Sequence, residues 1–200
     1  MTAVPPWPGE IGPVFLSEQQ IQQRVAQLGA QISQDYAGKD LVAVGVLKGV
    51  IIFMTDLLRA IRIPVRVDYL DIARYGLSRH TRGVVRLNKD LDEPLSNRHV
   101  LFVEDIIDTG LTSHFLLANL RQHGPASLRV CTLLNRTARR IIDVELAYVG
   151  FDVPDVFLVG YGLDFREHYR NLPYIVRFDP NRVPKEPGGD NKRAPTRTGA

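Results

Sequence analysis

The chain has 200 residues, of which 44% are apolar and 24% are charged. This is an ordinary globular composition, and it excludes collagen-like and low-complexity chains. The single cysteine, Cys131, cannot form an internal disulfide, so we expect a cytoplasmic protein. No apolar run reaches the roughly 20 residues that a membrane-spanning helix needs, and residues 1–13 lack the basic and apolar regions of a secretory signal.

The net charge of +3 is concentrated at one end of the chain. Residues 181–200 hold five basic and two acidic side chains, a surplus as large as that of the whole sequence. The remaining body is therefore about neutral, which argues against a nucleic-acid-binding domain. Prolines also gather at both ends, with four in residues 1–13 and four in 180–200. We therefore predict a flexible segment over 1–13, one domain over 14–179 and a disordered basic tail over 180–200.

Helical and strand patterns alternate along this domain. Ser17 and Gln20 have the spacing of a capping box, and the apolar residues after them predict an amphipathic helix over 18–36. The apolar run 41–46 is typical of a strand that is covered on both faces. We expect further helices at 50–61 and 111–122, a loop at 73–82, and strands at 65–72, 84–88, 100–104, 128–134 and near 146–150, 156–159 and 174–178. This alternation predicts an α/β fold with a mostly parallel central sheet and flanking helices.

The most informative stretch is residues 100–113, which read VLFVEDIIDTGLTS. A buried strand delivers Glu104 and Asp105, a short loop adds Asp108, and Thr109-Gly110 leads into a helix. In open α/β sheets ligands bind at the carboxyl ends of strands, and a helix N-terminus attracts phosphate. A lone Asp-Thr-Gly could simply cap a helix, but the full unit indicates a phosphate site.

Two common phosphate loops are excluded by the order of these residues. The stretch lacks the GxxxxGK[ST] order of a Walker loop and the GxGxxG order of a dinucleotide fold. Adjacent acids before a phosphate loop favour a sugar phosphate, with hydroxyls or a metal at Glu104 and Asp105 and a phosphate monoester at the helix start.

The segment VEDIIDTG resembles the phosphoribosyl diphosphate (PRPP) binding motif of type I phosphoribosyltransferases, in its hypoxanthine-guanine form. Other stretches match in order, and the resemblance covers about 14–179: VLKG at 46–49, LLNRT at 133–137 and VGFDVPDVFLVGYGLDFREHYRNLP at 149–173. The resemblance implies the fold of that family, with a small hood region for the base. It also implies transfer of phosphoribose from PRPP to hypoxanthine, and to guanine, with release of pyrophosphate.

The resemblance assigns the PRPP side of the site. It implies that Glu104 and Asp105 hold the ribose hydroxyls, directly or through Mg2+, and that Asp108 is the general base or acid at purine N7. The 5′-phosphate would be bound by Thr109, Gly110, Leu111 and Thr112. Pyrophosphate would be bound by a loop that often contains a non-proline cis peptide, formed by Leu47, Lys48 and Gly49, together with Arg170. Arg74 and Tyr75 would belong to a mobile loop over the site.

The resemblance also assigns the purine side. Phe157 matches the aromatic that stacks on the purine, and the backbone of Leu158 would read the purine edge. Asp164 matches a carboxylate that binds Mg2+ beside the purine and pyrophosphate. Family members are usually homodimers or homotetramers, and the implied partners are PRPP and a 6-oxopurine base, with no membrane and no nucleic acid.

Two residues depart from the family pattern. Arg136 stands where a lysine usually donates to the purine 6-oxygen, and because the two cations are not interchangeable, the preference among hypoxanthine, guanine and xanthine stays open. Arg74 stands where a small polar residue is commoner. The alternatives are a xanthine-preferring transferase and a PRPP-sensing regulator that binds nucleic acid through the basic tail. Asp108 argues against the regulator, because a sensor needs no base at N7.

Overall fold

The computed structural model describes residues 11–75 and 84–182. Their central element is a six-stranded sheet in the order β4-β3-β2-β5-β6-β7, in which only β4 runs antiparallel to its neighbour. The strands are β2 (Leu41–Leu47), β3 (Val65–Tyr75), β4 (Val84–Lys89), β5 (His99–Ile107), β6 (Ser127–Asn135) and β7 (Tyr148–Asp152). The predicted α/β fold with a mostly parallel sheet is therefore confirmed.

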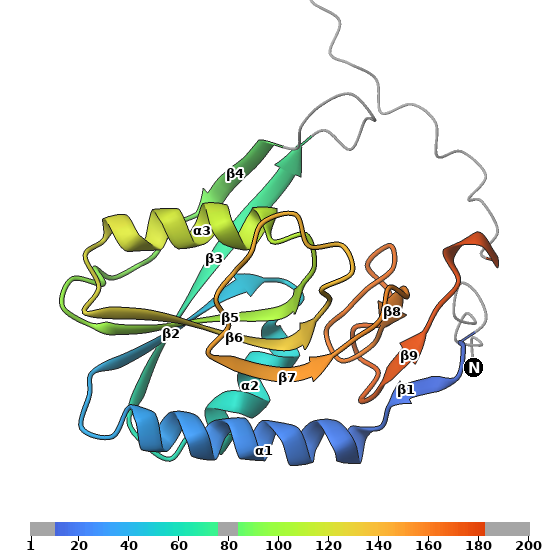
Figure 1. The fold of residues 1–200 in the computed structure, drawn as a ribbon, viewed down its shortest axis with the longest axis horizontal. Helices are drawn as coiled ribbons and strands as arrows, with labels where there is room; N and C mark the ends of the chain where they lie inside the picture. The colour runs from blue at the N-terminus through green and yellow to red at the C-terminus, as the bar shows by residue number, and fades with distance from the viewer. Residues whose placement is uncertain (1–10, 76–83, 183–200) are drawn as a thin grey trace, which may run out of the picture.

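Helices cover both faces of this sheet (Figure 1). The helices α1 (Glu18–Asp35) and α2 (Ile51–Ala60) lie on one face, and α3 (Leu111–Gln122) lies on the other. Along β2, Ala43 packs in the cluster with α1 and α2, while Val42 and Val44 pack in the cluster with α3. Because successive strand side chains point to opposite faces, a continuous apolar run is what a strand covered on both sides requires.

The first helix begins as the sequence predicts. The Ser17 hydroxyl accepts from the backbone N–H of Gln20 at 3.2 Å, and the Gln20 side chain accepts from the N–H of Ser17 at 2.9 Å. These are the two bonds of a capping box. No helix within the described ranges is both long enough and apolar enough to cross a membrane.

A second, three-stranded sheet lies beside the carboxyl ends of the parallel strands (Figure 1). It is antiparallel, in the order β1 (Val14–Leu16), β9 (Ile175–Arg177) and β8 (Leu158–Val159). Its own apolar cluster includes Val159, Tyr169 and Phe178. This sheet corresponds to the hood expected from the resemblance, and its strand β1 was not expected.

Several element boundaries differ from the expectation. The strand β5 continues past the expected end at residue 104 to Ile107, because it stays paired with β6 as far as Ile107 and Asn135. The expected loop at 73–82 is wrong for residues 73–75, which belong to β3 because β4 pairs alongside them; residues 76–82 lie outside the described residues. Residues 180–182 form a 3-10 helix at the start of the expected tail.

Candidate active site

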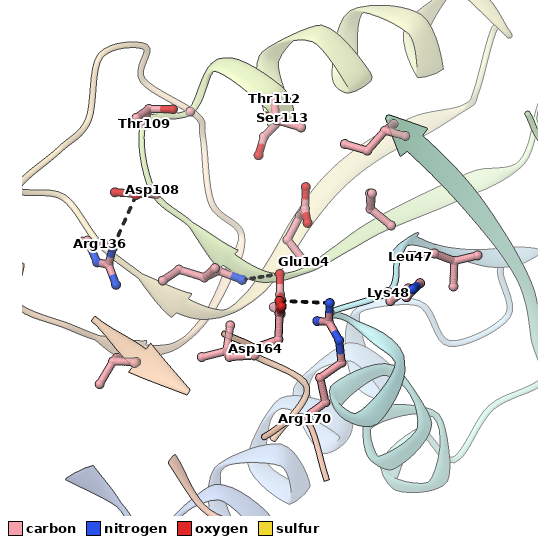
Figure 2. A pocket seen from close by; sticks show the side chains of 18 of the residues that line it. Leu47, Lys48, Glu104, Asp108, Thr109, Thr112, Ser113, Arg136, Asp164 and Arg170 are labelled. Carbon is pink, nitrogen blue, oxygen red and sulfur yellow. Dashed lines mark hydrogen bonds and ion pairs between the residues drawn. The ribbon is translucent and has the colours of Figure 1, made fainter. Parts of the chain in front are cut away.

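A cavity of about 790 Å³ opens at the carboxyl ends of the parallel strands, between them and the hood (Figure 2). Most residues that the sequence pointed to line it: Leu47, Lys48, Gly49, Glu104, Asp105, Asp108, Thr109, Gly110, Thr112, Arg136, Phe157, Leu158, Asp164 and Arg170. They come from distant parts of the chain, and only the parallel topology brings them to one edge of the sheet. Leu111 does not line the cavity, and its side chain is half-exposed, although its backbone belongs to the same helix start.

The turn between β5 and α3 has the geometry of an anion site. Gly110 is the N-cap of α3, with φ +80°, a left-handed conformation that glycine adopts at little cost. The N-cap residue itself has no side chain, and the Thr109 hydroxyl accepts from the N–H of Leu111 at 3.4 Å. The first turn of a helix has backbone N–H groups without helical partners, and the helix dipole adds positive potential there. Thr109 and Thr112 place hydroxyls at the same end (Figure 2).

The carboxylates of β5 enter the cavity from two faces of the strand. Glu104 is buried, with 7% of its surface exposed. Asp105 accepts from the N–H of Ile106 at 2.8 Å, and its carboxylate packs against Gly49, where a Cβ atom would collide with it. The absence of a side chain at Gly49, just after β2, therefore leaves room for the Asp105 carboxylate beside the cavity.

Asp108 and Arg136 form an ion pair across the cavity wall (Figure 2). One carboxylate oxygen of Asp108 lies 3.4 Å from an Arg136 Nη, while its other oxygen is buried without a hydrogen-bond partner. Arg136 is itself buried and donates to the carbonyl of Val156 at 2.7 Å. The pair thus joins the β5–α3 turn to the segment that precedes Phe157.

An exposed aromatic face lies next to this pair. Phe157 is 41% exposed although it lines the cavity, and it packs edge-to-face on Phe165 with ring centroids 5.9 Å apart. Leu158 follows it in β8, where it pairs with Arg177 of β9. A flat base can stack on such a supported ring.

Two cations mark the opposite side of the cavity. The peptide bond between Leu47 and Lys48 is cis, as the resemblance implied. Lys48 Nζ lies 3.0 Å from Glu167. Arg170 lies 2.9 Å from Asp164 and donates to the carbonyl of Gly162 at 2.7 Å. The hydrogen bond from Lys48, with the charge of Arg170, holds the pKa of Glu167 below its ordinary value.

Several lining residues received no role from the sequence, among them Asp71, Ser113 and Glu167. Ser113 follows the recognised unit directly, and Glu167 lies inside a matched stretch, yet neither residue type at that position signals a ligand. For Arg74 and Tyr75 the structure describes only the backbone, which ends β3 opposite Val85 and Val84.

The donor set is compatible with Mg2+. No group of three or more metal-ligating side chains is clustered among residues 11–75 and 84–182. Mg2+ in nucleotide enzymes commonly uses only one or two carboxylates, with water and substrate phosphates completing the shell. Glu104, Asp105 and Asp164 present carboxylates to the same cavity, so oxygen donors of the required kind are present.

Comparison with known proteins shows the family to which this chain belongs. The model of the phosphoribosyl transferase domain family matches residues 15–166. A hypoxanthine-guanine phosphoribosyltransferase of Mycobacterium tuberculosis is 49% identical over 180 residues, which cover 87% of this chain and 89% of the relative.

Solved structures give the same result. A hypoxanthine phosphoribosyltransferase from Staphylococcus aureus superposes with a TM-score of 0.82 at 43% identity, over 86% of this chain and 93% of that one. A hypoxanthine-guanine-xanthine phosphoribosyltransferase superposes with a TM-score of 0.74 at 40% identity, over 83% of this chain and 96% of that one. With the domain match spanning most of the chain, and with relatives of this identity, the protein belongs to the phosphoribosyltransferase family, in its hypoxanthine-guanine branch.

Proposed function

We propose that the protein transfers the 5-phosphoribosyl group of PRPP to hypoxanthine, and to guanine, giving IMP or GMP and pyrophosphate in purine salvage. One observation carries the proposal: the β5–α3 turn, with its acids and its glycine N-cap, opens into a cavity that has Lys48 and Arg170 on its other side. Cavities of about 300–1,000 Å³ are the usual size for small-molecule sites. The names of the relatives supply the substrate class.

The two ends of PRPP would be held by different chemistry. The 5′-phosphate would accept from the backbone N–H groups and hydroxyls of residues 109–112 at the start of α3. Pyrophosphate would lie against the cations of Lys48 and Arg170, on the side of the cavity away from α3. The anchored substrate then presents its ribose C1 between these ends, next to the strand β5.

The reaction breaks the bond from C1 to pyrophosphate and forms one from C1 to a purine nitrogen. Positive charge grows on the ribose as the bond breaks, and the carboxylates of Glu104 and Asp105 would stabilise it. Glu104, Asp105 and Asp164 would also hold Mg2+, which neutralises charge on the departing pyrophosphate. The proton at purine N7 would pass to the carboxylate of Asp108, which lines the cavity.

The purine would lie on the exposed face of Phe157, with its edge along the backbone of Leu158. Arg136 is fixed by the carbonyl of Val156, so its guanidinium offers donors to the purine 6-oxygen from a set position. A donor there favours a 6-oxo group over a 6-amino group, because an amino group would leave the buried donor unpaired.

Three further assignments rest on the resemblance or on composition. Arg74 and Tyr75 would contact PRPP from the segment that follows β3. The chain would assemble as a homodimer or homotetramer. A cytoplasmic location is supported by Cys131, which is free and buried.

A xanthine-preferring transferase is the second candidate. Arg136 is the observation that favours it, because the planar guanidinium has more donors than a lysine and the two cations are not interchangeable. The superposition on a hypoxanthine-guanine-xanthine enzyme shows that the same fold accepts all three bases in a relative. A purely PRPP-sensing regulator is disfavoured, because Asp108 lines the cavity as a candidate base and a sensor needs no base there.

Initial rates decide between these functions. The purified full-length chain is mixed with PRPP, Mg2+ and one base at a time, and nucleotide formation is followed with hypoxanthine, guanine, xanthine and adenine. We expect turnover with hypoxanthine and guanine and none with adenine. A higher kcat/KM with xanthine than with either would establish the second candidate, and no product with any 6-oxopurine would reject both transferases.

A further inference from the structure

In the β5–α3 turn, which would bind the phosphate, the backbone carbonyls of residues 107–109 all accept hydrogen bonds from one other segment of the chain. A loop that binds an anion must turn its N–H groups toward the ligand and its carbonyls away from it. Here the carbonyl of Ile107 accepts from the N–H of Arg136 at 3.0 Å, and the carbonyl of Thr109 accepts from the N–H groups of Ile141 and Ile142 at 2.9 and 3.1 Å. One segment, residues 136–142, therefore lies along the back of the turn.

A single side chain completes this set of contacts. Arg140 Nε donates to the carbonyl of Asp108 at 2.9 Å, and its Nη2 donates to the carbonyl of Ile107 at 3.3 Å. The same Nη2 donates to the Asn135 amide oxygen at 2.6 Å. Asn135 in turn donates to Asp152 at 2.7 Å, so the guanidinium is tied to the ends of both β6 and β7.

The aliphatic part of the Arg140 side chain packs against Gly110, the residue of the turn with a left-handed conformation. A Cβ atom placed on Gly110 would lie 3.2 Å from Arg140 Cδ, which puts the arginine stem directly behind the N-cap of α3. Arg140 is half-buried and does not line the cavity. It can therefore act on a ligand only through the turn that it holds.

We infer that Arg140 is a positioning residue of the transfer reaction, whose guanidinium fixes the carbonyls of Ile107 and Asp108 and thereby aims the phosphate-binding N–H groups and the Asp108 side chain. Arginine suits this position because its planar fork reaches two successive carbonyls and an amide oxygen at once, whereas lysine has one nitrogen. This inference rests on the proposed function of the turn as the 5′-phosphate site.

The test compares two neighbouring arginines. Arg140→Gln and Arg140→Lys are assayed beside Arg139→Gln, a matched control whose exposed side chain pairs with Asp155. A misplacement of about 1 Å at a reacting group can cost about 100-fold in rate. We expect both Arg140 variants to raise the KM for PRPP by about tenfold or more and to lower kcat, with the KM for hypoxanthine changed far less. Arg139→Gln should match the wild type.

The outcomes separate this inference from the proposed function. If the wild type makes no nucleotide, the proposed function fails. If the wild type turns over but the Arg140 variants lose only thermal stability, with the KM for PRPP unchanged, or if Arg140→Lys behaves like the wild type, the positioning role is refuted. Should substitution at 140 prevent folding, Asn135→Ser decides instead: it keeps Arg140 but removes its anchor, and an unchanged KM for PRPP would refute the role.

Discussion

Replacement of Gly110 by alanine tests whether the start of α3 binds the phosphate. Gly110 has φ +80°, and a Cβ atom there would collide with the carbonyl of Ile142. That carbonyl cannot easily move away, because the N–H groups of Ile141 and Ile142 are both bonded to Thr109. The turn must therefore shift, and with it the N–H groups that would hold the phosphate.

The expected magnitude has two parts. The left-handed conformation costs an alanine about 1–2 kcal/mol, which in a domain of this size lowers Tm by about 2–8 °C. The collision with Ile142 displaces the turn further, and a shift of about 1 Å in a group that positions substrate lowers kcat/KM by about 100-fold. We therefore expect a large kinetic loss on top of a moderate loss of stability.

A second glycine distinguishes the conformational cost from the effect of displacing the turn. Gly38 has a similar φ of +73° and has nothing within 4 Å of an added Cβ. Gly38→Ala should lower Tm by the conformational cost alone and leave kcat/KM for PRPP unchanged. The assay is thermal unfolding together with initial rates of IMP formation. If Gly110→Ala keeps a kcat/KM within twofold of Gly38→Ala, the reasoning about the turn is wrong.

Three further predictions concern single side chains. Asp108→Asn should lower kcat by about 100-fold, the usual scale for a lost general base, while the KM for PRPP stays nearly constant; wild-type kcat would remove Asp108 from that role. Arg136→Lys should change the ratio of kcat/KM for hypoxanthine to kcat/KM for xanthine by about tenfold. The single nitrogen of lysine cannot make all the hydrogen bonds of the guanidinium, and one lost hydrogen bond to a charged group is worth about 1.5–3 kcal/mol. An equal change in the KM for PRPP would show that Arg136 does not face the base. Burial raises the pKa of Asp68, but hydrogen bonds from the N–H of Asp92, a neighbouring N–H and Lys89 outweigh it and leave that pKa below its ordinary value. The contribution of Asp68 to stability is therefore present above about pH 3.9 and is lost as pH falls through the folded-state pKa. Urea unfolding of Asp68→Asn should therefore show a weaker loss of stability below pH 4 than that of the wild type. Free energies of unfolding that fall in parallel with pH for the two proteins would contradict this.

Local patterns were sufficient to predict most of the fold. The run at 41–46 is apolar on both faces because helices cover both faces of β2, and the capping box at Ser17 forms as its spacing indicates. What local pattern could not give is where paired strands end. The acids Glu104 and Asp105 look like the end of a strand, yet β5 continues because β6 offers partners beyond them.

In the site, too, the contiguous residues could be predicted from the sequence and the tertiary contacts could not. The unit from Glu104 to Thr112 is contiguous, so its chemistry can be recognised from sequence order. The contact from Arg136 to Val156 and the contact from Arg140 to Asp108 join segments 20 and 32 residues apart, and no spacing rule predicts them. Such contacts depend on the tertiary fold, which is why Arg140 was not recognised as part of the turn.

The most direct test of the central claim is a crystal structure of the protein with IMP. The account predicts the 5′-phosphate on the N–H groups of residues 109–112 at the start of α3, with the purine stacked on Phe157 and its 6-oxygen facing Arg136. A nucleotide whose phosphate lies anywhere else, with that helix start unused, would contradict it.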